Sequence, residues 1–186
     1  MLILVIVLAL IVLVAIIFIL IRNSMIASRN RVDEAWSGID VQLKRRHDLV
    51  PNLVETVKGY ATHEQKTFEK VTQARAVAMQ AASVQATQQA EAQLSGALAE
   101  VRAVAEQYPD LRATENFQQL QRDLNEIEDE IQASRRIYNS NVQAYNTKIQ
   151  IFPNSIVASS GGFTDREFFE IDGAEREPVS VSFGNA

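Results

Sequence analysis

The first 21 residues of the chain contain only Met, Leu, Ile, Val, Ala and Phe. As an α-helix this run is about 30 Å long, which matches the hydrocarbon core of a bilayer. A secretory signal peptide is the alternative interpretation, but its apolar region is about 7–15 residues long, follows a basic segment and ends at a small-residue cleavage site. No basic segment precedes this run. The sequence therefore predicts an uncleaved transmembrane anchor over residues 1–21.

The charges beside the anchor favour one orientation. Arg22, Arg29 and Arg31 follow it directly. Basic residues near a span stay mainly on the cytoplasmic side, so we expect a cytoplasmic body. Asp33 and Glu34 reduce this bias and leave a periplasmic body as the alternative.

Beyond the anchor, apolar residues recur at helical spacing, and the sequence predicts an all-α body over residues 22–152. One helix is expected to continue out of the membrane span to about residue 58, and a turn follows at Gly59 to His63 with Thr62 as the next N-cap. The second helix is expected over residues 64–107 and the third over 115–152, each ended by a proline. Seven-residue periods mark the first and third helices, with these residues on the two seams: Trp36, Leu43, Val50 and Val57; Phe117, Leu124, Ile131, Tyr138, Tyr145 and Phe152.

Short turns between long helices predict an elongated, antiparallel up-down-up bundle of three helices. The second helix is several residues longer than the first one above the span. It must therefore break in its Ala- and Gln-rich middle, tilt, or begin later. Its alanine-rich face is shallow, which suits close contact with another helix.

Residues 153–186 form an acidic tail, with two arginines against six acidic residues and a net charge of −4. Ser159 to Gly162 are expected to form a flexible link. Thr164-Asp165-Arg166-Glu167 has the pattern of a capping box and predicts a short helix through Phe169. The alternation of Val179, Val181 and Phe183 predicts a strand or an extended segment.

Several classes of function lack support. A near-neutral body with an acidic tail argues against nucleic-acid binding. The chain has no cysteine, and His47 and His63 are its only histidines, four helical turns apart and outside any His-Glu-x-x-His motif. No Gly-x-Ser-x-Gly motif occurs. We therefore expect no metal site, no cofactor and no enzymatic activity.

The polar residues inside the heptad seams are the candidate site. Arg46 falls on the apolar seam with His47 beside it, and a buried guanidinium needs partners. Folding three helices up, down and up places Arg46 level with Asn141 to Tyr145. Pro51 removes the helical donor of the His47 carbonyl and predicts a bend, a hinge or a binding notch. The candidate residues are Arg45, Arg46, His47, Asp48, Pro51, Asn52, Tyr138, Asn141, Tyr145 and Asn146.

Three interpretations of this layer remain open: a buried polar layer that fixes helix register, a partner or ligand site, or an Arg46 side chain that extends to solvent. The same fold-back places an acidic run near Arg29 and Arg31, where we expect surface ion pairs. That run contains Glu126, Glu128, Asp129 and Glu130.

Three segments of the chain, Arg29–Trp36, Asp40–Val54 and Tyr145–Gln150, resemble the LemA family of bacterial membrane proteins. Tyr108–Leu111, Glu115–Phe117 and Arg166–Phe169 fit the same pattern. The resemblance implies a single-pass protein of the bacterial inner membrane with an antiparallel helical bundle and no established enzymatic activity. Members are often encoded near HtpX-type membrane metalloproteases or TPM-domain proteins, and a relative serves in magnetosome formation.

The anchor and heptads favour a membrane-anchored scaffold that contacts lipid, self-associates and binds other membrane proteins. The alternative is an accessory subunit or regulator of an HtpX-type protease, with a membrane protease or TPM-domain protein as partner. An enzyme would have to use Arg46, His47 and Asp48 on one helix, and no sequence motif supports this third possibility.

Overall fold

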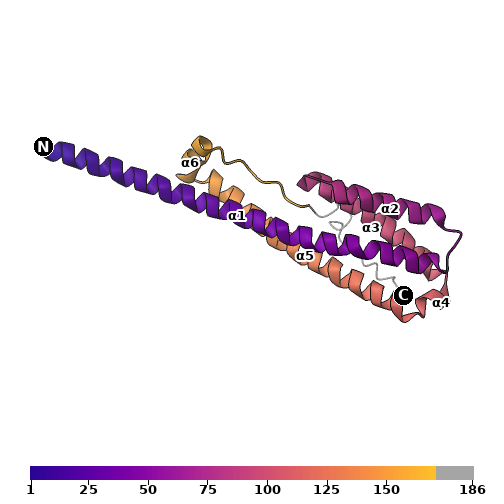
Figure 1. Ribbon diagram of the computed structural model, residues 1–186. Coiled ribbons are helices and arrows are strands. Elements are labelled where there is room, and N and C mark those ends of the chain that lie inside the picture. Colours follow the sequence, from indigo (N-terminus) through magenta and orange to yellow (C-terminus); the bar gives the residue numbers. More distant parts are fainter. Residues whose placement is uncertain (171–186) are drawn as a thin grey trace, which may run out of the picture. The chain divides into compact units, whose positions relative to one another are not determined.

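A computed structural model describes residues 1–170 of the chain. Every regular element in this range is a helix, which confirms the predicted all-α class (Figure 1). The helices are α1 Leu2–Lys58, α2 Gln65–Gln80, α3 Val84–Glu106, α4 Pro109–Arg112, α5 Glu115–Gln150 and α6 Asn154–Gly161. The strand or extended segment expected at Val179 to Phe183 lies outside the described residues.

The chain divides into two compact units. Unit 1 contains residues 1–49 and 121–168, and unit 2 contains residues 50–120 together with Phe169 and Glu170. In α1 the division falls between Leu49 and Val50, just before Pro51, which lies inside the helix.

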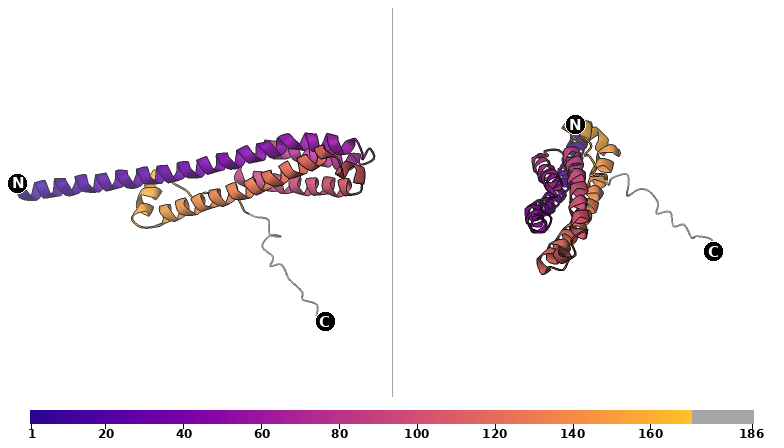
Figure 2. Two further views of the ribbon diagram at one scale, coloured as in Figure 1. Left: turned by 90° about the horizontal axis from the view of Figure 1, so that it is seen from below. Right: turned by 90° about the vertical axis from the view of Figure 1, so that its right-hand side faces the viewer.

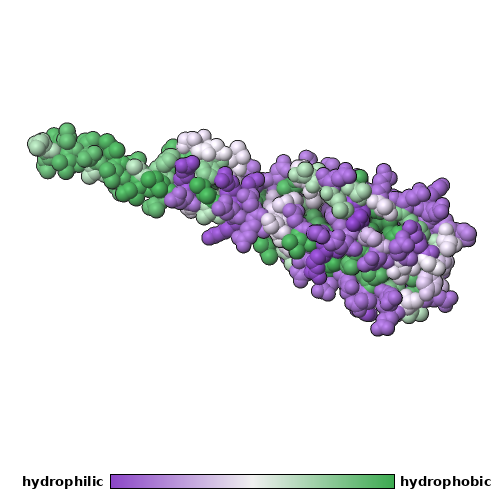
Figure 3. Space-filling model, in the orientation of Figure 1, coloured by the Kyte–Doolittle hydropathy of each residue, from purple (hydrophilic) through white to green (hydrophobic). Residues whose placement is uncertain are grey.

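Helix α1 is continuous from the apolar segment into the body, as predicted, and has 57 residues. It is the single described helix that is long and apolar enough to cross a membrane. Nothing in residues 1–170 covers its first part: the large apolar side chains from Leu2 to Leu20 are exposed. Figure 3 shows this part of the helix with an apolar surface.

In unit 1, α5 runs beside α1 in the opposite direction (Figure 1 and Figure 2). Contacts along the pair show the register: Arg46 meets Glu128, and Trp36 meets Tyr138. Lys148 near the end of α5 reaches Ser24 on α1. The buried side chains between these contacts follow the helical period and include Met25, Val32, Ile39, Leu43, Ile127, Ile131 and Val142.

In unit 2, α2 and α3 form an antiparallel hairpin whose ends are held by a salt bridge between Lys70 and Glu100. Pro109 is the first residue of α4. The first N–H groups of a helix have no helical acceptor, so a proline at this position breaks no helical hydrogen bond. The core of the unit is apolar and includes Leu53, Val57, Phe68, Val71, Leu94, Val101, Leu111 and Phe117.

The prediction of a single second helix over residues 64–107 is wrong. The chain leaves the helix at Ala81, and the extended Ser83 starts α3 by accepting a hydrogen bond from the N–H of Ala86 at 3.2 Å. This extra reversal makes α5 antiparallel to α1 instead of parallel to it. The up-down-up bundle of three helices is therefore wrong too, although one of the ways foreseen for the second helix to fit was a break in this region.

Two local predictions also fail. Glu64 and not Thr62 is the N-cap of α2, and it makes no side-chain cap hydrogen bond. The segment Thr164–Glu170 is not helical, whereas Ser159 to Gly161 of the expected flexible link belong to α6. Helix α6 is followed by its C-cap Gly162, whose φ of 67° is the left-handed conformation that glycine adopts without strain.

Candidate functional site

Residues Phe163–Phe168 follow α6 as a non-helical segment of unit 1, here called the strap. The side-chain amide of Asn146 on α5 donates to the carbonyl oxygen of Arg166 at 2.9 Å. The amide oxygen of Asn146 accepts the N–H of Arg166, also at 2.9 Å. A carboxamide is both donor and acceptor, so one side chain satisfies both backbone groups of Arg166.

Tyr138 holds the next residue of the strap. Its hydroxyl donates to the carbonyl oxygen of Glu167 at 2.8 Å. Its ring is buried and packs edge-on against Trp36 of α1, with the ring centroids 5.3 Å apart. Burial raises the pKa of Tyr138 above its usual value; Arg166 opposes this shift, and Glu167 and Asp33 add to it. The neutral phenol that the hydrogen bond requires is therefore favoured.

Helix α1 contributes two charged contacts to the strap. The guanidinium of Arg166 binds a carboxylate oxygen of Asp33 at 2.8 Å, and both side chains are partly exposed. The guanidinium of Arg29 lies 5.8 Å from the ring centroid of Phe163. Exposed pairs of this kind contribute about 0–1 kcal/mol each, so they orient the strap more than they stabilise it.

Tyr145 lies between the two helices and is almost completely buried. Burial raises the pKa of Tyr145, while Arg166 and Arg29 lower it and Asp165 and Asp33 raise it. The strap site is defined here as Arg29, Asp33 and Trp36 of α1, Tyr138, Tyr145 and Asn146 of α5, and Phe163, Arg166 and Glu167 of the strap.

The Arg46 layer is a second polar cluster in unit 1. The Arg46 side chain is 4% exposed and donates to Glu128 at 2.7 Å. Gln132 donates to the other oxygen of Glu128 at 3.3 Å. His47 is buried in the same turn of α1. The charge of Arg46 is thus balanced by an acidic residue of α5, and this layer is distinct from the strap site.

The predicted position of Arg46 beside Asn141 and Tyr145 is wrong. Because α5 is antiparallel to α1, Arg46 faces Glu128, whereas the acidic run was expected near Arg29 and Arg31. The physical reason is the extra reversal at Ala81 to Ser83.

The other candidate residues lie apart from both clusters or at their rims. Asp48 pairs with Lys44 at 2.8 Å, and Arg45 donates to Gln42 at 3.0 Å on the exposed face of α1. Pro51 and Asn52 are exposed in unit 2, and Asn141 is half-buried on α5. The structure therefore brings together Tyr138, Tyr145 and Asn146 and separates them from Arg46 and His47.

Sequence reasoning missed six members of the strap site: Arg29, Asp33, Trp36, Phe163, Arg166 and Glu167. The signal was present in the family resemblance, because three of the matching segments, Arg29–Trp36, Tyr145–Gln150 and Arg166–Phe169, supply most of its contacts. Residues far apart in the chain thus match the family pattern and meet at one place.

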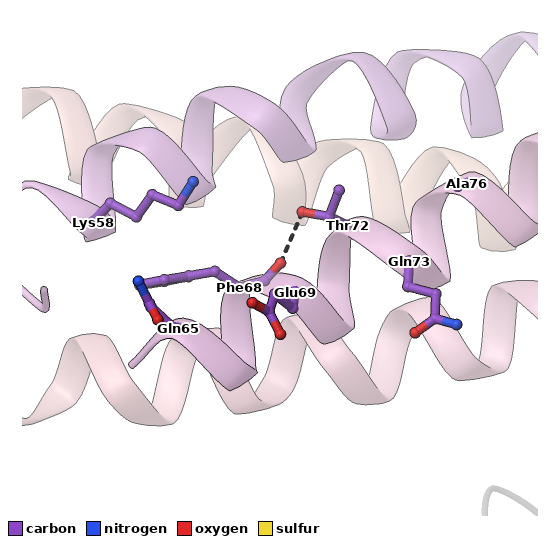
Figure 4. A pocket seen from close by; sticks show the side chains of 7 residues that line it. All are labelled: Lys58, Gln65, Phe68, Glu69, Thr72, Gln73 and Ala76. Carbon is purple, nitrogen blue, oxygen red and sulfur yellow. Dashed lines mark hydrogen bonds between the residues drawn. The ribbon is translucent and has the colours of Figure 1, made fainter. Parts of the chain in front are cut away.

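Unit 2 has surface grooves, two of which involve α2. One, of about 440 Å³, is lined by α2 and by Lys58, whose ammonium lies 5.9 Å from the ring centroid of Phe68 (Figure 4). The polar side chains on its wall, such as Gln65 and Gln73, are spread along the helix in Figure 4. The second groove, of about 500 Å³, lies on the α2–α3 hairpin and is described below.

Within residues 1–170 no group of three or more His, Asp or Glu side chains is placed to hold a metal ion. The contacts of the strap site hold the strap against helices α1 and α5 by neutral and charged hydrogen bonds. These observations define an all-helical protein whose N-terminal helix is compatible with a single membrane span.

The comparison with protein families identifies this class more closely. The model of the LemA family matches residues 35–183, so the chain belongs to the LemA family. This confirms the resemblance found in the sequence.

Curated relatives agree with the family match. The chain is 27% identical to protein LemA of Metamycoplasma hominis over 165 residues, which cover 87% of this chain and 74% of that protein. It is 25% identical to magnetosome protein MamQ 2 of Paramagnetospirillum magneticum, over 84% of this chain and 67% of the relative. Magnetosome protein MamQ of Magnetospirillum gryphiswaldense is 24% identical over 77% of this chain and 62% of its own length.

Proposed function

We propose that this LemA-family protein is a membrane-anchored helical scaffold that self-associates and binds other membrane proteins in the bacterial inner membrane. The observation that carries the proposal is that α1 is one uninterrupted helix with two different environments. The side chains of its first part are apolar and exposed, and its later part is packed in the core of unit 1. A bundle built on the same helix as the anchor is held at a defined position on the membrane.

The energetics support a lipid environment for the first part of α1. Its exposed large apolar side chains run from Met1 to Leu20. Leaving each one in water costs about 1.5–3 kcal/mol, so the segment as a whole would cost on the order of tens of kcal/mol. That exceeds the usual net stability of a domain, about 5–15 kcal/mol.

The groove on the α2–α3 hairpin supports self-association. Its small and apolar lining consists of Ala74 and Val77 of α2 and Gly96 and Ala97 of α3, and its polar lining consists of Lys70, Gln73, Gln93 and Glu100. A Cβ built at Gly96 would meet nothing within 4 Å, so the backbone here is open to a close neighbour. Val77 is exposed at its edge. Small residues allow helices to approach closely, and we propose that a second copy of the chain covers this face.

Disulfide cross-linking tests this surface directly, because the chain has no cysteine of its own. Val77→Cys in the full-length protein should form disulfide-linked dimers when isolated membranes are treated with a mild oxidant such as copper phenanthroline, which takes up the two electrons of the paired thiols. Ala103→Cys, on an exposed part of α3 outside the groove, is the matched control and should remain monomeric. Equal cross-linking of both variants, or of neither, would count against this surface.

The other proposed partners are tested by cross-linking in the same membranes, followed by mass spectrometry. Adducts with other membrane proteins would support the scaffold. A membrane protease or a TPM-domain protein as the main adduct would favour the accessory role instead.

We also propose that the body lies on the cytoplasmic side, because Arg22, Arg29 and Arg31 follow the apolar segment and the first acidic residue is Asp33. A fusion of alkaline phosphatase after Ala186 should be inactive, and the matching fusion of green fluorescent protein should fluoresce. An active phosphatase would place the body in the periplasm.

A further inference from the structure

The corner between α5 and α6 exposes apolar side chains that nothing in the described chain covers. Ile151 is 51% exposed, Phe152 79% and Ile156 61%. Outside the apolar first part of α1, Phe152 and Ile156 have the largest exposed fractions of any large apolar residue in the described range. Apolar residues gathered in this way mark an interaction surface.

The register of α5 on α1 places this corner next to the end of the apolar segment. The ammonium of Lys148 lies 3.3 Å from the hydroxyl of Ser24 and 3.4 Å from its carbonyl oxygen, and it also bonds the hydroxyl of Ser28. Ser24 is about 5 Å beyond Ile21, at about 1.5 Å per residue. Since α5 runs towards the anchor, the residues that follow Lys148 lie at or below this level (Figure 2).

The headgroup layer of a bilayer lies at the same level along α1 as this corner. The hydrocarbon core is about 30 Å thick and the headgroup regions bring the total to about 40–45 Å, so each headgroup layer is about 5–7.5 Å deep. With residues 1–21 across the core, Ile151, Phe152 and Ile156 fall within that layer. Apolar and aromatic side chains are favoured there when the polar face of the same segment points to water.

The charges at this end of unit 1 suit a lipid surface. No acidic residue occurs from Ile131 to Thr164, and α6 has no charged residue. The cations here are Arg22, Arg29 and Lys148, which can approach lipid phosphates. Asp165 is the nearest acidic residue on the strap, and it accepts a hydrogen bond from Gln150 at 3.1 Å.

We infer that the α5–α6 corner docks on the lipid surface, with Ile151, Phe152 and Ile156 inserted in the headgroup layer of the bilayer that the anchor crosses. This inference rests on the proposed membrane anchor. A second attachment beside the span fixes the tilt of unit 1 against the membrane, since a single helix alone leaves tilt and rotation free.

Site-specific fluorescence on the full-length protein tests the inference, and the lack of native cysteine makes single labelling clean. Phe152→Cys and Ile156→Cys are each labelled with the environment-sensitive dye NBD and placed in nanodiscs of equimolar phosphatidylethanolamine and phosphatidylglycerol. Both positions are exposed, so neither substitution removes a core contact. We expect blue-shifted emission at both positions and strong quenching by lipids with a headgroup nitroxide.

Two matched variants separate the possible outcomes. Ile137→Cys is also on α5 and 59% exposed, but it lies about 20 Å further from the anchor than Gln150, the last residue of α5, at about 1.5 Å per residue, and should give the emission of the dye in water. Ile11→Cys, within the apolar segment, should be blue-shifted and quenched by nitroxides on the acyl chains.

A corner that resembles Ile137, with Ile11 in lipid, would overturn the docking inference and leave the anchor intact. A blue shift at Phe152 without lipid quenching would show that protein covers the corner and would also overturn it. If Ile11 itself is not quenched by lipid, the membrane anchor fails and the docking fails with it.

Discussion

The carboxamide of Asn146 binds the backbone of Arg166 in both directions, donating to its carbonyl oxygen and accepting from its N–H, each at 2.9 Å. Together with the bond from Tyr138 to Glu167, it attaches the strap to α5 over two consecutive residues. Since these three bonds are to backbone groups, they depend on the side chains of Asn146 and Tyr138 and not on those of Arg166 and Glu167.

Replacing Asn146 by aspartate should release the strap. Asn146→Asp keeps the shape of the side chain but removes the donor, and its carboxylate then faces the Arg166 carbonyl. We expect the free energy of unfolding to fall by about 1–3 kcal/mol and proteolytic cleavage near Arg166 to speed up. Asn52→Asp makes the same chemical change at an exposed position of unit 2 and should stay within about 0.5 kcal/mol of wild type. Equal effects of the two variants would contradict the bidentate pairing.

The hydrogen bond from Tyr138 predicts a pH dependence. Its pKa is raised by burial in the folded state. Its contribution is therefore fully present below the pKa of an unfolded tyrosine, about 10, and is lost as the pH rises through the folded-state value. The phenolate has no proton to donate to Glu167.

Tyr138→Phe should lower the free energy of unfolding by about 0.5–1.5 kcal/mol at neutral pH. The difference from wild type should shrink above about pH 10, as followed by urea unfolding at several pH values. Tyr60→Phe, at an exposed position of unit 2, is the control and should show no difference at any pH. A gap between Tyr138→Phe and wild type that is independent of pH would contradict this prediction.

The Arg46 layer should behave as a coupled pair with Glu128. Replacing either residue by leucine removes a partner of the other, and the double variant should recover part of the loss, with a coupling energy of about 0.5–3 kcal/mol. Arg46→Leu and Asn141→Leu should instead add within about 0.3–0.5 kcal/mol, because the antiparallel register separates them. Thermal unfolding of the single and double variants measures both cycles. Coupling of Arg46 to Asn141 in place of Glu128 would contradict the antiparallel register and support a parallel arrangement of α1 and α5.

Replacing each of two glycines by alanine should change the free energy of unfolding in opposite directions. Gly38 lies within α1, and a Cβ built there meets nothing within 4 Å, so Gly38→Ala should stabilise unit 1 by about 0.5–1 kcal/mol. Gly162 ends α6 with a φ of 67°, so Gly162→Ala should cost about 1–2 kcal/mol. Urea unfolding of the two variants measures both changes. Stabilisation by Gly162→Ala as well would show that the end of α6 is not in the left-handed conformation.

The elements that could be predicted from sequence are those whose signals are local. The continuous α1, the turn after Lys58, the end of a helix just before Pro109 and the bounds of α5 follow from periodicity, proline and turn residues within a few positions. The heptads of α5 also identified Tyr138 and Tyr145 as residues of the helix interface, and both are buried.

The parts that could not be predicted depend on distant contacts. Ala81 to Ser83 lie among good helix formers, and what ends the helix there is the packing of α2 on α3 together with the cap at Ser83. The sequence from Thr164 to Glu167 has the pattern of a capping box, but Asn146, 20 residues away, satisfies the backbone of Arg166 instead. One missed reversal also changed the partner of Arg46 from Asn141 to Glu128.

The mass of the full-length protein, extracted in mild detergent and measured by light scattering with the detergent contribution subtracted, tests the proposed scaffold most directly. Self-association through the α2–α3 groove predicts more than one chain per particle, and a shift towards the single chain in a Val77→Glu variant, where a charge enters the proposed contact. A mass of one chain for the wild type, across several detergents and with lipid added, would contradict the proposal.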